Sequence, residues 1–123
     1  MSRMKILSVA TLTLAFLVSA FAADITGKWT SSFESQIGPQ KYTFDLKVTG
    51  DTITGQATSD QRGAVEIKEG KISGENVSFV EPANIQGQDI RIEYNGKVSG
   101  DEMKLTRKVG DFATYEIVAK RAK

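Results

Sequence analysis

The sequence predicts an all-β protein, a single eight-stranded antiparallel up-and-down (meander) β-barrel. Apolar and polar residues alternate along almost the whole chain after residue 22, and no helical period appears there. A phrase of strand, glycine turn and strand also occurs three times, at residues 47–53, 71–77 and 97–103. The glycines of this phrase, Gly50, Gly74 and Gly100, recur at a spacing that suits two strands and their connections. The phrases are therefore expected to be successive hairpins of one meander.

Residues 1–22 are expected to be a signal peptide, and residues 23–123 a single barrel domain. A positively charged start, an apolar run over residues 6–18 and the small residues of Ala20-Phe21-Ala22 predict cleavage after Ala22. An uncleaved membrane helix is the alternative, but the run is shorter than the roughly 20 residues that span a bilayer. We expect a bacterial protein that is secreted or periplasmic. No cysteine follows the cleavage site, so no lipid anchor is expected.

Charge and composition limit the classes of partner that are expected for the mature chain. The full chain has 16 basic and 15 acidic residues, and loss of the two basic residues of the leader leaves 14 against 15. No basic stripe or charge run remains, so neither nucleic acid nor, after cleavage, a membrane is expected as a partner. Because cysteine is absent, the fold must be held by strand closure and not by disulfides. The oligomeric state stays open.

Eight strands follow from the alternation. Along the second, for example, Tyr42, Phe44 and Leu46 are separated by polar residues, as in a strand with one buried face. The strands are expected over residues 25–34, 41–49, 52–59, 64–73, 76–81, 90–99, 102–108 and 112–121.

Closure into a barrel is favoured over an open two-sheet sandwich, which is the alternative. Within residues 64–73 the apolar side changes between Ile67 and Ile72, which predicts a β-bulge near Glu69-Gly70. Three glycines each precede a lysine and a large apolar residue, where a strand can kink to close a barrel: Gly27, Gly70 and Gly96.

The segment Ile25-Thr26-Gly27-Lys28-Trp29-Thr30 is similar to the first strand of the calycins, the superfamily of lipocalins, fatty-acid-binding proteins and avidins. The resemblance implies that Trp29 plugs one end of the barrel and that a basic side chain of the last strand lies across it. Alternation and closure bring Arg121 toward Trp29, in reach of a cation–π contact. A ligand contact is the alternative role of this pair. Biotin-binding residues cannot be carried over, because Trp29 is the only tryptophan. The repeated hairpins resemble small secreted bacterial domains without an assigned activity.

The two ends of the barrel are expected to differ. The three glycine hairpins lie at one end together with Trp29 and Arg121, and they are too tight to shape a cleft. The other end is expected to carry longer, amide-rich loops that include Gln86, over residues 35–40, 60–63, 82–88 and 109–111. Such loops could hydrogen-bond a small or polar ligand, although plain solvated loops are the alternative.

Near that mouth, two charged residues are expected to face inward. Alternation places Arg107 and Glu81 on the buried face, where a charge is costly unless it is paired or hydrated. Arg107 could pair with Glu81, or receive an anionic head group as basic residues do in some fatty-acid-binding barrels. Frayed strand ends that leave both groups in water are the alternative. Phe33, Tyr42 and Tyr115 line the same half, in an interior expected to be mostly filled.

Enzymatic chemistry is disfavoured. The absence of histidine and cysteine excludes the usual catalytic triads and zinc sites with nitrogen or sulfur ligands. No cofactor or metal is expected, because the acids that could hold calcium sit where turns favour acids: Asp51, Glu75, Asp101 and Glu102. The expected function is ligand binding by a non-enzymatic secreted barrel. The alternative is a protein-interaction module, such as a periplasmic protease inhibitor or an accessory domain. Barrel-shaped inhibitors of this kind normally contain a cysteine pair, which this chain lacks.

Overall fold

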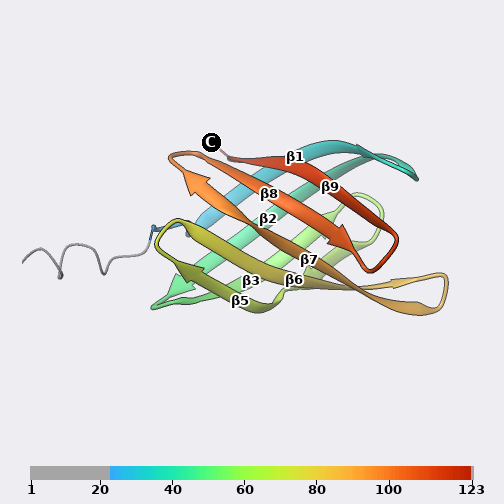
Figure 1. The fold of residues 1–123 in the computed structure, drawn as a ribbon, viewed down its shortest axis with the longest axis horizontal. Helices are drawn as coiled ribbons and strands as arrows, with labels where there is room; N and C mark the ends of the chain where they lie inside the picture. The colour runs from blue at the N-terminus through green and yellow to red at the C-terminus, as the bar shows by residue number, and fades with distance from the viewer. Residues whose placement is uncertain (1–22, 123) are drawn as a thin grey trace, which may run out of the picture.

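The computed structural model describes residues 23–122 and shows a closed antiparallel β-barrel (Figure 1). Its strands are β1 (Gly27–Ser35), β2 (Gly38–Thr49), β3 (Thr52–Ser59), β4 (Gly63–Glu66), β5 (Lys68–Ser73), β6 (Asn76–Ile85), β7 (Gln88–Ser99), β8 (Glu102–Val109) and β9 (Ala113–Arg121). Strands that follow one another in sequence pair, except that β4 and β5 both pair with β3, and β1 pairs with β9 to close the wall. The all-β meander is thus confirmed. The predicted signal peptide, residues 1–22, lies outside the described residues.

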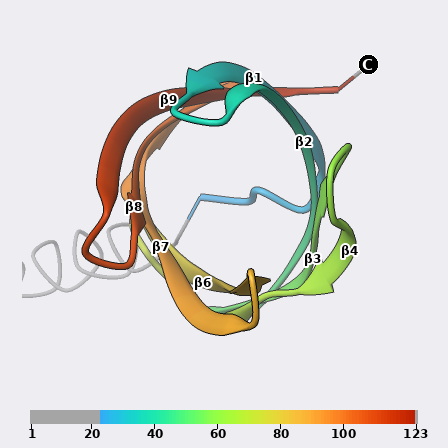
Figure 2. The same ribbon diagram turned by 90° about the vertical axis from the view of Figure 1, so that its right-hand side faces the viewer.

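Segments β4 and β5 together form one of the eight wall strands. They are separated at Ile67, and the pairing of β5 with β6 shifts between Lys68 and Lys71. Glu69, at the shift, has a φ of 53°, which is rare outside glycine. The bulge predicted near Glu69-Gly70 is therefore confirmed. It lets β4 turn away from β6, so that β6 and β7 continue past it as a two-stranded ribbon (Figures 1 and 2).

The three repeated phrases form tight hairpins, as predicted. Their two-residue turns begin with Gly50, Gly74 and Gly100, whose φ angles are 64°, 59° and 62°. Each following acidic residue has a negative φ, so the turns belong to the type II′ class, which requires glycine at the first position. No helix long and apolar enough to cross a membrane occurs within residues 23–122.

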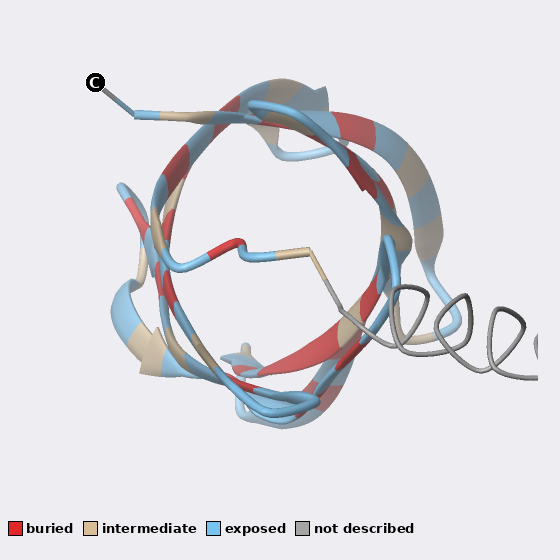
Figure 3. Ribbon diagram, turned by 90° about the vertical axis from the view of Figure 1, so that its left-hand side faces the viewer, coloured by how far each residue is buried: buried red, intermediate tan, exposed pale blue. Residues whose placement is uncertain are grey.

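The end of the barrel with these hairpins is plugged by the chain itself. Segment Ala23–Thr26 lies across the opening (Figure 3), and its first amide donates to the carbonyl oxygen of Gly74 over 2.9 Å. Ile25 is fully buried and accepts a 2.9 Å hydrogen bond from the indole nitrogen of Trp29. The guanidinium carbon of Arg121 lies 4.4 Å from the centroid of the Trp29 ring. The expected cation–π contact is present, and Arg121 also donates to two carbonyl oxygens of the plugging segment.

At the other end, the long loops expected over residues 35–40 and 82–88 are wrong, whereas the connections expected over 60–63 and 109–111 are present to within one residue. Strand β2 begins at Gly38 and β6 continues to Ile85, so the connections are turns of two or three residues. The strand predicted over residues 76–81 ends just before Pro82, but the observed strand β6 runs through this proline. It is tolerated because β6 pairs with β5 only as far as Val80, so a missing N–H on that side breaks no ladder.

Gly96 provides a test of how tightly the wall is built. A Cβ atom at Gly96 would lie 1.9 Å from the carbonyl oxygen of Lys104 on β8. We expect Gly96→Ala to lower the free energy of unfolding by about 3 kcal/mol, because the two strands must separate. Urea denaturation measures this, with Asn95→Ala, at an exposed neighbour on the same strand, as the control. Equal stability of the two variants would contradict the close approach, since alanine is otherwise better than glycine in a strand.

Candidate ligand-binding site

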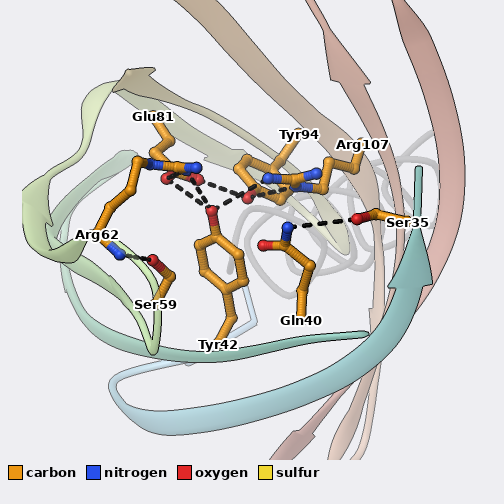
Figure 4. A network of polar contacts seen from close by, with 8 residues as sticks. All are labelled: Ser35, Gln40, Tyr42, Ser59, Arg62, Glu81, Tyr94 and Arg107. Carbon is orange, nitrogen blue, oxygen red and sulfur yellow. Dashed lines mark hydrogen bonds and ion pairs between the residues drawn. The ribbon is translucent and has the colours of Figure 1, made fainter. Parts of the chain in front are cut away.

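A buried carboxylate lies at the centre of a polar network in the mouth half of the barrel (Figure 4). Glu81 on β6 faces inward, and its side chain is only 1 % exposed. It accepts hydrogen bonds from the hydroxyls of Tyr42 (2.8 Å) and Tyr94 (2.7 Å) and from a terminal nitrogen of Arg62 (2.6 Å). These groups come from β2, β7 and the turn between β3 and β4, so the network joins segments from across the barrel.

Arg107 on β8 enters the same network from a position directly opposite Tyr94 on the neighbouring strand β7. The residue is 3 % exposed; its Nε donates to the Tyr94 hydroxyl and a terminal nitrogen to the Tyr42 hydroxyl, each over 3.0 Å. Its guanidinium carbon also lies 5.0 Å from the centroid of the Phe33 ring. The direct pair with Glu81 considered from the sequence is replaced by contacts through the tyrosine hydroxyls. The alternative of frayed, hydrated ends is wrong, because both charges are buried.

The protonation states of the network follow from burial and from the Glu81 charge. Burial raises the pKa of Tyr42, and that of Tyr94 more strongly; the nearby carboxylate acts in the same direction. Both hydroxyls therefore stay protonated and can donate. Burial opposes the charge of Arg62 and Arg107, but favourable charge interactions and hydrogen bonds with the tyrosines and Glu81 outweigh it, and the pKa of each lies above its usual value. Two guanidinium groups against one carboxylate leave one excess positive charge.

A cavity of about 270 Å³ opens above this network, at the end of the barrel that faces the viewer in Figure 2. Gln40, Arg62 and Arg107 line its polar part. Much of the remaining wall is apolar and is formed by Ile85, Ile90, Ile92, Val109, Phe112 and Ala113. Arg62 and Arg107 are the charged residues of the lining, which contains no acidic side chain. The cavity is therefore apolar at its sides and positive toward the network.

Another hollow, of about 500 Å³, lies on the outer wall beside Pro82 and is more open to solvent. The charges of Glu69 and Arg91 in its lining are paired with each other. This hollow offers no buried charge to a ligand, so the mouth cavity is the stronger candidate.

The structure brings most of the predicted site residues together. Phe33 stacks against Tyr42, with ring centroids 5.9 Å apart, and lies 6.2 Å from the Tyr115 ring. Tyr115 lines the cavity, and its hydroxyl accepts a hydrogen bond from the backbone N–H of Gln36. Gln86 lies at the exposed tip of the β6–β7 ribbon, on the rim of the cavity and apart from the network. Trp29 and Arg121 lie at the opposite, plugged end.

Three residues of the site were not singled out: Tyr94 was missed as a candidate, whereas Gln40 and Arg62 were expected only as part of the mouth loops over residues 35–40 and 60–63. For Tyr94 a signal existed, because the turn at Gly100 places Ser99 opposite Glu102. Counting back along both strands then sets Tyr94 opposite Arg107, as the structure has it. Gln40 was assigned to a loop although it has the same parity as Tyr42. Arg62 lies in a turn, where no period indicates direction.

Comparison with known proteins gives no related site with which this one can be compared. No protein-family model, no curated protein and no solved structure matches the chain. Within residues 23–122, no three acidic side chains gather in a way that could hold a metal ion; this range includes the hairpin acids considered above.

Glu81→Gln tests whether the carboxylate supports the fold. The amide keeps the size of the side chain but leaves two guanidinium groups, that of buried Arg107 and that of partly buried Arg62, without a counter-charge. We expect a loss of about 3 to 5 kcal/mol in the free energy of unfolding, measured by urea denaturation. Glu93→Gln, which weakens an exposed ion pair with Arg91, should cost less than about 1 kcal/mol. Similar losses in the two variants would contradict the central role of Glu81.

Tyrosine ionisation gives a second test of the network. The folded pKa values of Tyr42 and Tyr94 lie above the unfolded value, so the folded state holds these protons more tightly. Their contribution to stability is full below about pH 10 and is lost as the pH rises above the unfolded pKa. We expect tyrosinate absorbance from these two residues to appear only with alkaline unfolding, followed in parallel by circular dichroism. Replacing both by Phe should remove that late absorbance. Ionisation of either tyrosine near pH 10 in the folded protein would contradict the assignment.

Proposed function

We propose that this protein is an exported, non-enzymatic binding protein that holds a small molecule in the mouth of its barrel. The observation that carries the proposal is the cavity of about 270 Å³, which combines apolar walls with two arginines, Arg107 buried and Arg62 partly buried. Small-molecule sites are typically concave, mostly apolar and furnished with a few fixed polar groups that orient the ligand.

Binding is favoured over catalysis by the state of Glu81. Its two oxygens already accept three hydrogen bonds, so it is not free to take a proton from a substrate. A general base must lie within hydrogen-bond reach of the proton that it removes. The cavity lining contains no second carboxylate that could serve instead.

The calycin relationship and the export of the chain belong to this proposal. The stack of Arg121 on Trp29 supports a calycin-like barrel, and the leader-like character of residues 1–22 supports export. N-terminal sequencing of the protein recovered from the exported fraction of its host should begin at Ala23. A chain that begins at Met1 would contradict export with cleavage.

A protein-interaction module is the second candidate. It is favoured by two apolar side chains on the rim, since Ile37 is 66 % and Phe112 61 % exposed. Exposed apolar groups at one end of a barrel suit contact with another protein. Native mass spectrometry of the protein purified gently from its host separates the two candidates. A retained small molecule supports the binding barrel, whereas a retained protein partner supports the interaction module.

Blocking the mouth tests the proposed function directly. Ala113 lines the cavity at the start of β9, and Ala113→Trp should fill it and abolish retention of the small molecule. Thr114→Trp is the matched control, because Thr114 is exposed on the other face of the same strand and should leave retention unchanged. Native mass spectrometry compares the two variants, with thermal unfolding as a check of the fold. Full retention by Ala113→Trp would place the ligand elsewhere.

A further inference from the structure

We infer that the mouth cavity binds apolar carboxylic acids that carry a hydrogen-bond donor beside the carboxylate, as N-acyl amino acids do. The inference rests on the proposed function and names the ligand class of that site. Three features carry it: the net charge of the network, two buried polar atoms without partners, and the apolar walls.

The charge of the site favours a single negative charge on the ligand. Arg62 and Arg107 both line the cavity, and Glu81 neutralises only one of them. A monocarboxylate balances the remaining charge, whereas a phosphate, with its charge of nearly two, would exceed it. The planar guanidinium group also matches the planar carboxylate. The site therefore suits a carboxylate better than a phosphate.

Two buried atoms have no hydrogen-bond partner within the described residues, Nε of Arg62 and Oε1 of Gln40. The orientation of the Gln40 amide is fixed by Ser35. The Ser35 hydroxyl donates its one proton to the carbonyl oxygen of Gly38, so it can only accept from Gln40 and does so from Nε2. The amide oxygen must then point away from Ser35, toward the rest of the network (Figure 4).

One of these two atoms needs a hydrogen-bond acceptor and the other needs a donor. Nε of Arg62 needs an acceptor, which a carboxylate supplies, and Oε1 of Gln40 needs an N–H or O–H group. An unpaired buried polar group costs free energy that a bound ligand recovers when it supplies the missing partner. A ligand with a donor close to its carboxylate would satisfy both atoms once Arg62 turns toward the cavity that it lines together with Gln40.

Entry of the head group requires a side chain to move, because neither atom contacts solvent. Arg62 is the side chain placed to do so. It comes from the three-residue turn between β3 and β4, and its side chain is 19 % exposed, against 1 % for Glu81. Glu81 keeps its two tyrosine hydrogen bonds when Arg62 turns toward the ligand.

The walls of the cavity determine the polarity and size of the rest of the ligand. Ile85, Ile92 and Val109 lie on different strands around the cavity, so the part of the ligand beyond the head group is apolar. The cavity of about 270 Å³ holds roughly nine water volumes, which suits a short acyl group and a small apolar side chain.

Titration calorimetry with three matched probes tests the inference. N-acetyl-leucine carries the carboxylate and the donor, 4-methylpentanoate lacks the donor, and N-acetyl-leucinamide lacks the charge. We expect N-acetyl-leucine to bind about tenfold more tightly than either of the other two, a factor that corresponds to one hydrogen bond or more. Inorganic phosphate should bind more weakly than N-acetyl-leucine.

Gln40→Leu is the decisive variant, because it removes a buried unpaired oxygen and costs the fold only the 3.3 Å hydrogen bond to Ser35. It should lower the affinity for N-acetyl-leucine to that for 4-methylpentanoate and leave the latter unchanged. Arg62→Gln should weaken both acids about tenfold and leave N-acetyl-leucinamide unaffected.

The inference is overturned if N-acetyl-leucinamide binds as well as the acid, if Gln40→Leu keeps the tenfold difference, or if no probe binds. If no probe binds and native mass spectrometry still finds a cargo that Ala113→Trp loses, the inference falls while the proposed function stands. If the purified protein also carries no cargo, both fall.

Discussion

The hydrogen-bonded carboxylate of Glu81 is the feature on which the mouth half of the barrel depends. The buried guanidinium group of Arg107 and the partly buried one of Arg62 would be unfavourable without a counter-charge, and Glu81 supplies it with the help of the Tyr42 and Tyr94 hydroxyls. Such a network is weak evidence for stability, because an apolar cluster of the same volume is often as stable or more so. Its position beside a cavity lined by both arginines therefore supports the proposed recognition of a polar group.

The architecture could be predicted from the sequence because it depends on local patterns. Alternation marks the buried face of each strand, and the glycine turns at Gly50, Gly74 and Gly100 fix the hairpins, so both were found without knowledge of distant contacts. The extent of β6 was not found. Whether Pro82 breaks a strand depends on whether a neighbouring strand needs its amide, and that neighbour is lost only because the bulge at Glu69 turns β4 away.

The site was predictable in part for a related reason. Parity along β6 and β8 placed Glu81 and Arg107 inward, and burial then follows from closure of the barrel. Parity does not say which inward residues face each other across the lumen. The pairing of Glu81 with Arg62 could be recognised only in the complete barrel. A turn residue carries no periodic signal, and the direction of its side chain is set by the strands on either side.

The two ends of the barrel use the same chemistry with different results. At the plugged end Arg121 stacks on Trp29, and its three guanidinium nitrogens donate to the Asp101 carboxylate and to the carbonyl oxygens of Thr26 and Asp24. At the mouth, Arg107 likewise lies over aromatic rings, but neighbouring Arg62 and Gln40 keep buried atoms that no described residue satisfies. Because buried polar groups in folded proteins are nearly always paired, this difference is informative. The plugged end is complete with the groups that the chain supplies, whereas the mouth end keeps buried polar atoms to which the proposed ligand would supply partners.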